Sequence, residues 1–96
     1  MNERKKAGQK KHDESVLRSA EWYKKYGFTT KADLPGWKKP KKIGGFIPDI
    51  IAKKGKKEII LEVETKNTDK SDTDQQKAFK KYSEREEGRI FRKKII

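Results

Sequence analysis

The chain of 96 residues contains no cysteine, only one histidine and only one methionine. The absence of cysteine excludes disulfides, thiolate zinc sites and cysteine nucleophiles, and it favours an intracellular, cytoplasmic protein. Hydrophobic residues make up only 30% of the sequence, and no apolar stretch is long enough to span a membrane. The basic start, residues 1–11, lacks the apolar segment of a secretory signal, so the sequence predicts neither export nor a membrane partner.

Acidic residues are few beside the basic ones, 15 against 27, and the formal net charge is +12. A polyanion is the natural partner of such a surface, because each phosphate neutralised by Lys or Arg releases counterions. The alternative is a charge-rich surface that self-repulsion keeps soluble. The sequence favours nucleic acid over an acidic membrane surface, because it shows no helix with a broad apolar face and basic flanks.

The length fits one domain with a small core. Residues 1–12 are predicted to form a flexible basic arm, either a phosphate-binding tail or a frayed terminus, and residues 13–96 a single domain. Apolar spacing and turn residues predict, in order, a helix over 13–26, a short strand over 28–31, a loop over 33–45, strands over 46–52 and 58–65, a helix from about 74 to 82 and a strand over 89–96. This order predicts an α/β fold, a mixed sheet with helices on its faces.

Carboxylates stand on the two strands that flank the turn KKGKK. Side chains alternate along a strand, so Ile60, Glu62, Glu64 and Lys66 are expected to share one face. An antiparallel hairpin can bring Asp49 alongside Glu62, where the two carboxylates repel unless a hard divalent cation such as Mg²⁺ lies between them. A metal held in this way activates water for attack on a phosphodiester. The alternative is that these carboxylates lie on the solvated face of the sheet.

The run IPDIIAKKGKKEIILEVETK, residues 47–66, resembles the core motif of the PD-(D/E)xK nuclease superfamily, most closely that of the archaeal Holliday junction resolvases. The motif's acidic pair is Pro48-Asp49, and Glu62 follows 13 residues after Asp49, a separation typical of that hairpin. The resemblance covers most of residues 13–96. It implies a restriction-endonuclease-like mixed sheet flanked by helices, and the activity of a metal-dependent DNA endonuclease.

The resemblance also implies roles for single residues. Asp49 and Glu62 would be ligands of Mg²⁺ or Mn²⁺, and the backbone carbonyl of Val63 would be the third ligand that the protein contributes. The third motif position departs from the pattern, because Glu64 stands where Lys is usual. Some restriction enzymes of the superfamily carry Glu there and remain active, so Glu64 is expected to orient the attacking water and Lys66 to lie near the scissile phosphate. The alternative is a nuclease-like module that binds DNA but cuts poorly or not at all.

The helices offer further candidates. Resolvases carry a Glu on the first helix, for which Glu14 is the best match here, followed by Glu21; a solvated helix residue is the alternative for both. Gln75 and Gln76 open the second helix, but their spacing to Tyr82 does not fit the Gln–Tyr pattern of some branches. Gln76 is expected to cap the helix, in a capping box with Thr73. His12, in the basic arm, is expected to be solvated.

Lysines before and within the hairpin are expected to grip backbone phosphates: Lys38, Lys39, Lys41, Lys42, Lys53, Lys54, Lys56 and Lys57. Trp37 lies among them, where it can stack on a base or fold back onto the edge of the core. Phosphate contacts position DNA without reading its sequence, so structure-selective cutting of double-stranded or branched DNA is expected. A homodimer is also expected, because the core is small and junction cutters need paired sites.

Overall fold

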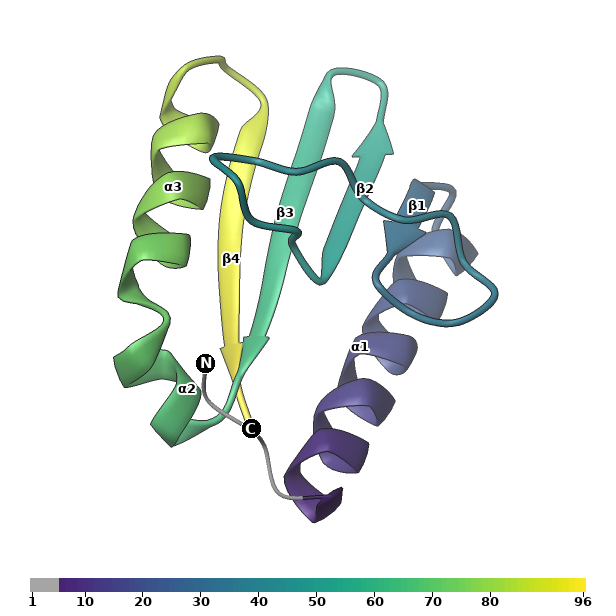
Figure 1. Ribbon diagram of the computed structural model, residues 1–96. Helices are drawn as coiled ribbons and strands as arrows, with labels where there is room; N and C mark the ends of the chain where they lie inside the picture. Colours follow the sequence, from purple (N-terminus) through teal and green to yellow (C-terminus); the bar gives the residue numbers. More distant parts are fainter. Residues whose placement is uncertain (1–5) are drawn as a thin grey trace.

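The computed structural model describes residues 6–96 of the chain (Figure 1). The elements of this part are, in order, α1 (Lys6–Lys25), β1 (Thr29–Ala32), β2 (Ile50–Lys54), β3 (Lys57–Glu64), α2 (Lys66–Ser71), α3 (Thr73–Glu84) and β4 (Arg89–Ile95). The strands form one mixed sheet in the order β1-β2-β3-β4. β1, β2 and β3 pair antiparallel, whereas β4 lies parallel to β3. The parallel pair requires a crossover, which α2 and α3 supply. The predicted α/β fold with a mixed sheet is therefore confirmed.

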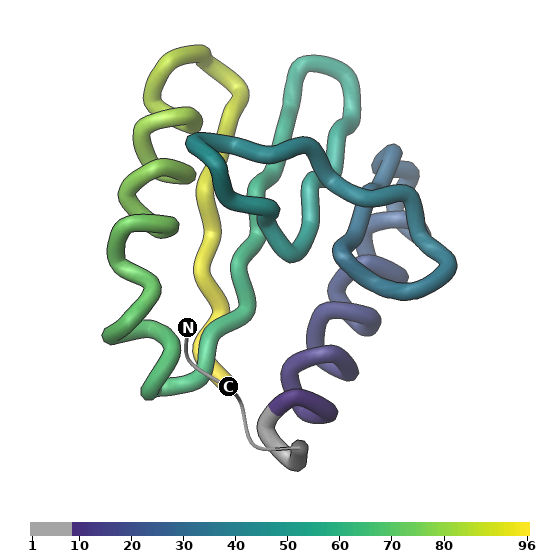
Figure 2. Tube along the Cα trace, in the orientation of Figure 1, coloured from purple at the N-terminus to yellow at the C-terminus, as the bar shows by residue number. Residues whose placement is uncertain are grey.

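Helices cover both faces of the sheet, because the alternating apolar residues of β3 point to both sides. Ile59, Leu61 and Val63 pack in one cluster with α1, and Ile60 packs in a second cluster with Phe79 of α3. The traces in Figures 1 and 2 show α1 and α3 flanking the sheet, with α3 running beside β4. A strand buried on both faces places the side chains of its carboxylates away from bulk water.

The loop over 33–49 leaves β1, crosses the sheet toward α3 and returns to β2 (Figure 2). Ile43 joins the cluster of Phe79, and Gly44 approaches Ala78 so closely that a Cβ on this glycine would collide with the Ala78 side chain. The loop is thus fastened to α3 before it delivers Asp49 to the start of β2.

Two predicted boundaries are wrong. α1 begins at Lys6, so the predicted flexible arm over 1–12 is helical from residue 6 onward, and residues 1–5 lie outside the described part. The helix extends backwards because this segment is rich in good helix formers and because His12 is buried. β2 begins only at Ile50 instead of residue 46, since Pro48 has no N–H for a ladder and Asp49 donates its own to a side chain.

The segment after β3 also differs from the prediction. Thr65 caps a short helix, α2, in a capping box with Thr68. The capping box expected between Thr73 and Gln76 does not form, because Thr73 is already helical and the Gln76 amide donates to Asp69. The polar run 67–74 therefore contains a helical turn that its lack of apolar periodicity concealed.

Candidate active site

The β2–β3 hairpin brings together the carboxylates that the sequence singled out. Its register pairs Ile50 with Leu61, so the residue before β2 lies beside Glu62. The Asp49 N–H donates to Glu62 Oε1 at 2.7 Å, and the Val63 N–H donates to Asp49 Oδ2 at 2.8 Å. Each carboxylate is thus fixed by the backbone of the neighbouring segment. The predicted juxtaposition of Asp49 and Glu62 is confirmed.

Glu62 lies in an environment that disfavours its charge. Its side chain is 2% exposed. Burial, followed by the nearby negative charge of Asp49, raises the pKa of Glu62 to about 10. Gln75 Nε2 donates to Glu62 Oε2 at 2.6 Å and so orients the carboxyl. A cation beside these carboxylates would reverse the balance and hold Glu62 ionised.

Gln75 was set aside in the sequence because its spacing to Tyr82 does not fit the known pattern. The structure nevertheless places it in the first turn of α3, directly over Glu62. A signal was present, since α3 follows β3 after one short helix and must begin near the end of that strand. The spacing from Gln75 to Tyr82 was therefore the wrong criterion. The position of the first turn of α3, near the end of β3, is what places Gln75 beside Glu62.

Glu64 is a second buried carboxylate on this strand, in surroundings that also disfavour its charge. It shares the face of Glu62, its side chain is fully buried, and neither of its oxygens has a hydrogen-bond partner among the described residues. Burial raises the pKa of Glu64, and the negative charge of Asp72 adds to the effect. Buried polar atoms are nearly always partnered, so an orphaned carboxyl indicates a missing ligand, water or ion.

Lys66 is not on the carboxylate face. β3 ends at Glu64, Thr65 caps α2, and Lys66 is the exposed first residue of that helix. The expectation that it continues the strand alternation is wrong, because the capping of α2 ends the strand two residues earlier. Lys66 still follows Glu64 closely in the chain, at the same end of the sheet.

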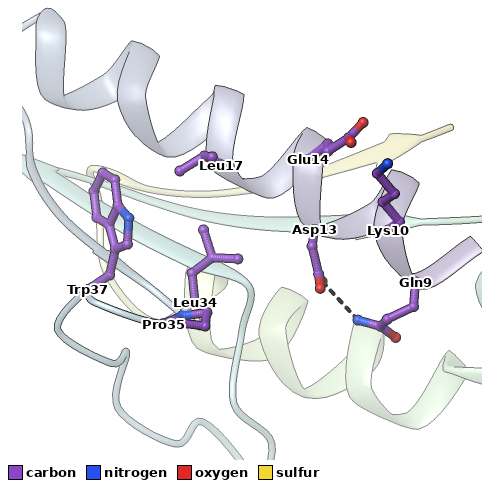
Figure 3. A pocket seen from close by; sticks show the side chains of 8 residues that line it. All are labelled: Gln9, Lys10, Asp13, Glu14, Leu17, Leu34, Pro35 and Trp37. Carbon is purple, nitrogen blue, oxygen red and sulfur yellow. Dashed lines mark hydrogen bonds between the residues drawn. The ribbon is translucent and has the colours of Figure 1, made fainter. Parts of the chain in front are cut away.

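The residue of α1 that reaches the site is His12, in place of the expected Glu14. Glu14 is exposed and points out of a pocket beside α1 (Figure 3). His12 is 5% exposed, with Nε2 3.2 Å from Asp49 Oδ2 and Nδ1 3.1 Å from Asp13 Oδ1. The prediction of a solvated histidine is wrong. Helical spacing held the signal, because His12 lies one turn before Val16 on the buried stripe of α1.

The donor atoms gathered here suit a hard divalent cation such as Mg²⁺ or Mn²⁺, which prefers oxygen ligands. Asp49 and Glu62 contribute carboxylates that repel each other, and Glu64 contributes oxygens without a partner. Within residues 6–96, no group of three or more His, Cys, Asp or Glu side chains is arranged to hold a metal ion. A site of two carboxylates completed by a backbone carbonyl, as the sequence predicts with Val63, needs no such group.

The lysines of the hairpin gather away from the carboxylates. Five residues separate Lys57 from Glu62, so the turn lies about 16 Å from the carboxylates along the strand. A pocket of about 190 Å³ at this end is lined by Lys41, Lys53, Lys56, Lys57 and Arg89, among others. These lysines can hold a nucleic acid at a distance from the site, but they do not surround it.

The remaining lysines of the predicted set have varied surroundings. Lys54 donates to the Tyr26 carbonyl at 2.9 Å, and Lys39 pairs with Asp33 at 3.1 Å. Lys38 and Lys42 are exposed. Lys38, Lys39 and Lys42 lie on the loop that leads to Asp49, so these cations flank the chain segment that enters the site.

Trp37 lies against the core, as one of its two interpretations held. It is partly buried and packs on the cluster between α1 and the sheet, with Lys24 Nζ 5.6 Å from its ring centroid. The ring nevertheless borders a pocket beside α1 (Figure 3). Packing against the core edge and contact with a ligand are therefore compatible for this residue.

Comparisons of the chain with protein-family models, with curated protein sequences and with solved structures found no match. Among residues 6–96, no helix combines the length and the apolar character that crossing a membrane requires. The case for a function of this chain therefore depends on its motif and on the chemistry of the site itself.

Proposed function

We propose that the protein is a metal-dependent DNA endonuclease with a restriction-endonuclease-like fold, structure-selective in the manner of a Holliday junction resolvase. One observation carries the proposal: Asp49 and Glu62 meet at the start of the hairpin, and Glu64 is buried on the same strand face without a hydrogen-bond partner among residues 6–96. Charged groups buried in this way are unfavourable in an apo protein. They are favourable where a divalent cation and a phosphate complete the site.

Asp49 and Glu62, with the Val63 carbonyl, would hold Mg²⁺ or Mn²⁺. When bound, the ion supplies positive charge at the phosphate and lowers the pKa of a water molecule. The chain's own groups set the geometry: Gln75 fixes Glu62, and the His12 ring fixes Asp49.

Glu64 would accept a hydrogen bond from the attacking water, because its two oxygens have no other described partner. Lys66, exposed at the start of α2, would contact a phosphate beside the cut. In-line attack would form a bond from the water oxygen to phosphorus as the bond to the leaving oxygen breaks. The water would release one proton to solvent, and the leaving oxygen would take one up from solvent.

The surface charge supports DNA as the substrate. The net charge of +12 favours a polyanion, and the cationic end of the hairpin lies about 16 Å from the carboxylates. Cations placed far from the cut hold the backbone without reading bases. Such a surface suits recognition of the shape of branched or double-stranded DNA better than recognition of one base sequence. A homodimer would supply the second cut that a junction requires.

A second candidate is a nuclease-like DNA-binding module without activity. It is favoured by Glu64, which stands where the superfamily has Lys and so leaves the site without that positive charge. A module of this kind would bind DNA through the same lysines but would have no use for the metal.

Cleavage assays separate the two candidates. Labelled linear, nicked, flapped and four-way-junction DNA is incubated with Mg²⁺, with Mn²⁺ and with chelator. Asp49→Asn and Glu62→Gln are compared with wild type, and Asp74→Asn, an exposed carboxylate of α3, is the matched control. Metal-dependent cutting that both site variants lose and the control keeps supports the endonuclease. Salt-dependent binding without cutting by wild type supports the inactive module, and the absence of both rejects DNA as the substrate.

A further inference from the structure

A pocket of about 500 Å³ lies between the N-terminal half of α1 and the loop after β1 (Figure 3). Its apolar end is formed by Leu17, Leu34, Pro35 and the indole ring of Trp37. Leu17 is 39% exposed although it stands on the helix that covers the sheet. An open apolar wall with an aromatic ring suits a flat, aromatic ligand.

The other end of the pocket is polar and leads to the candidate active site. Asp13 accepts from Gln9 Nε2 at 2.8 Å, and Glu14 stands one residue further along the rim. Asp13 Oδ1 also lies 3.1 Å from His12 Nδ1, and His12 Nε2 lies 3.2 Å from Asp49 Oδ2. One imidazole ring therefore separates the pocket from the carboxylates of the hairpin.

Cations stand where the backbone of a nucleic acid ligand would pass. Lys10 lines the pocket itself. Trp37 also borders an adjoining hollow of about 510 Å³, which Lys24 and Lys25 line together with Leu17 and Glu21. An aromatic ring with ammonium groups around it matches the arrangement in which a base stacks while its phosphates are neutralised. An apolar peptide would satisfy the wall of the pocket but would leave these cations without a counterpart.

We propose that this pocket takes one unpaired nucleobase of the DNA substrate, stacked on Trp37 with its polar edge toward Asp13. The inference rests on the proposed endonuclease and adds to it a preference for an unpaired nucleotide near the cut. A base can enter a pocket between a helix and a loop only after it has left the duplex stack. Substrates with an unpaired or easily extruded base at the site are therefore bound most tightly.

The polar edge of the pocket also predicts which bases are favoured. An ionised carboxylate only accepts hydrogen bonds, so Asp13 suits bases whose exocyclic amine donates. Cytosine offers its N4 amine to such an acceptor, whereas thymine presents a carbonyl oxygen at the same position. Unpaired cytosine is therefore expected to bind more tightly than unpaired thymine.

The test uses the fluorescence of Trp37. The chain has two tryptophans, so Trp22→Phe leaves Trp37 as the only one. In chelator, this protein is titrated with duplexes that carry one unpaired cytosine, one unpaired thymine or one abasic nucleotide, and with a blunt duplex. Anisotropy of a label on the DNA reports binding separately. We expect quenching of Trp37 by the unpaired bases alone, and binding of the cytosine duplex about tenfold tighter than that of the abasic duplex.

Variants localise the effect. Trp37→Ala is expected to bind the cytosine and abasic duplexes equally, whereas Trp22→Ala, which removes a 52% exposed ring of the same size, keeps the difference. If Trp37→Ala does not fold, Leu17→Phe serves in its place, because it narrows the pocket without removing a buried side chain. This variant should bind DNA but should lose the preference for the cytosine duplex over the abasic duplex. Asp13→Asn should reduce the preference for cytosine over thymine.

The outcomes distinguish this inference from the proposed function. Equal binding of all duplexes without quenching overturns the pocket and leaves the endonuclease untouched. Failure to bind any DNA rejects both. Quenching that rises with protein concentration in the absence of DNA would place a second copy of the chain in the pocket and would also overturn the inference.

Discussion

Glu62→Gln should stabilise the metal-free protein at alkaline pH, although it removes a residue of the candidate active site. In wild type, burial and the charge of Asp49 raise the pKa of Glu62 from 4.5 to about 10. The folded protein therefore holds a proton that the unfolded chain has already released over this range. Stability that depends on this proton is fully present below pH 4.5 and is lost as the pH rises toward 10.

The dependence of the free energy of unfolding on pH has an upper limit. One proton held only by the folded state changes the free energy of unfolding by at most about 1.4 kcal/mol per pH unit. Between pH 6 and pH 8 the wild type should therefore lose up to about 2.7 kcal/mol, a large share of the stability of a small domain. The substituted amide does not titrate and keeps one oxygen to accept the Asp49 N–H, while Gln75 can turn its own amide to match.

Urea unfolding in chelator, from pH 5 to pH 9, measures both slopes. Glu84→Gln, an exposed carboxylate on α3, is the control and should follow the wild type. Added Mg²⁺ or Mn²⁺ at pH 8 should stabilise the wild type but leave Glu62→Gln unchanged, because the cation needs the carboxylate. Parallel pH profiles for the wild type and Glu62→Gln would refute the reasoning, since they would mean that Glu62 titrates alike in the folded and unfolded states.

Three further variants test the fold and the DNA surface. Gly88→Ala should lower the free energy of unfolding by at least about 1–3 kcal/mol, since Gly88 has a φ of 87° and a Cβ there would collide with the Lys56 carbonyl oxygen; a neutral result in urea unfolding would contradict this close approach. Phe79→Ala should cost about 3–5 kcal/mol in the same assay, because the ring is fully buried between α3 and the sheet, and a loss below 1 kcal/mol would mean that the second cluster is loosely packed. Replacing Lys56 and Lys57 by Gln should reduce the slope of log K for DNA binding against log salt by about 0.9 for each lysine that contacts a phosphate, and an unchanged slope would exclude the hairpin turn from the interface.

The sequence predicted the hairpin and its carboxylate pair because both depend on local rules. Alternation along residues 58–65 assigned the two faces of β3, and the short turn around Gly55 set an antiparallel partner. Once those two facts hold, the register leaves Asp49 no place except beside Glu62. The mixed sheet followed in the same way, since the polar run and the helix before the last strand allow a parallel return to β3.

The residues that come to the site from elsewhere in the chain were missed, because the signals for them are not local to the hairpin. His12 reaches Asp49 from 37 residues away, and its burial depends on a helix that begins at Lys6 in a segment with few apolar residues. Gln75 reaches Glu62 only because the capped turn of α2 shortens the path from β3 to α3. The predicted placement of Lys66 was wrong because Thr65 caps α2 and so ends the strand alternation on which that placement depended.

Two buried carboxylates of β3 differ in whether the fold itself provides partners for them. Glu58 and Glu64 stand on the same face of β3, and both are buried. Glu58 accepts a hydrogen bond from the Tyr82 hydroxyl and has Arg89 and Lys53 each at 3.7 Å, so the fold itself compensates its charge. Glu64 has no such partner among the described residues. A fold that surrounds one buried carboxylate with donors and leaves the other without any is compensating the first from within, and we infer that the second is compensated only when metal, water and phosphate occupy the site.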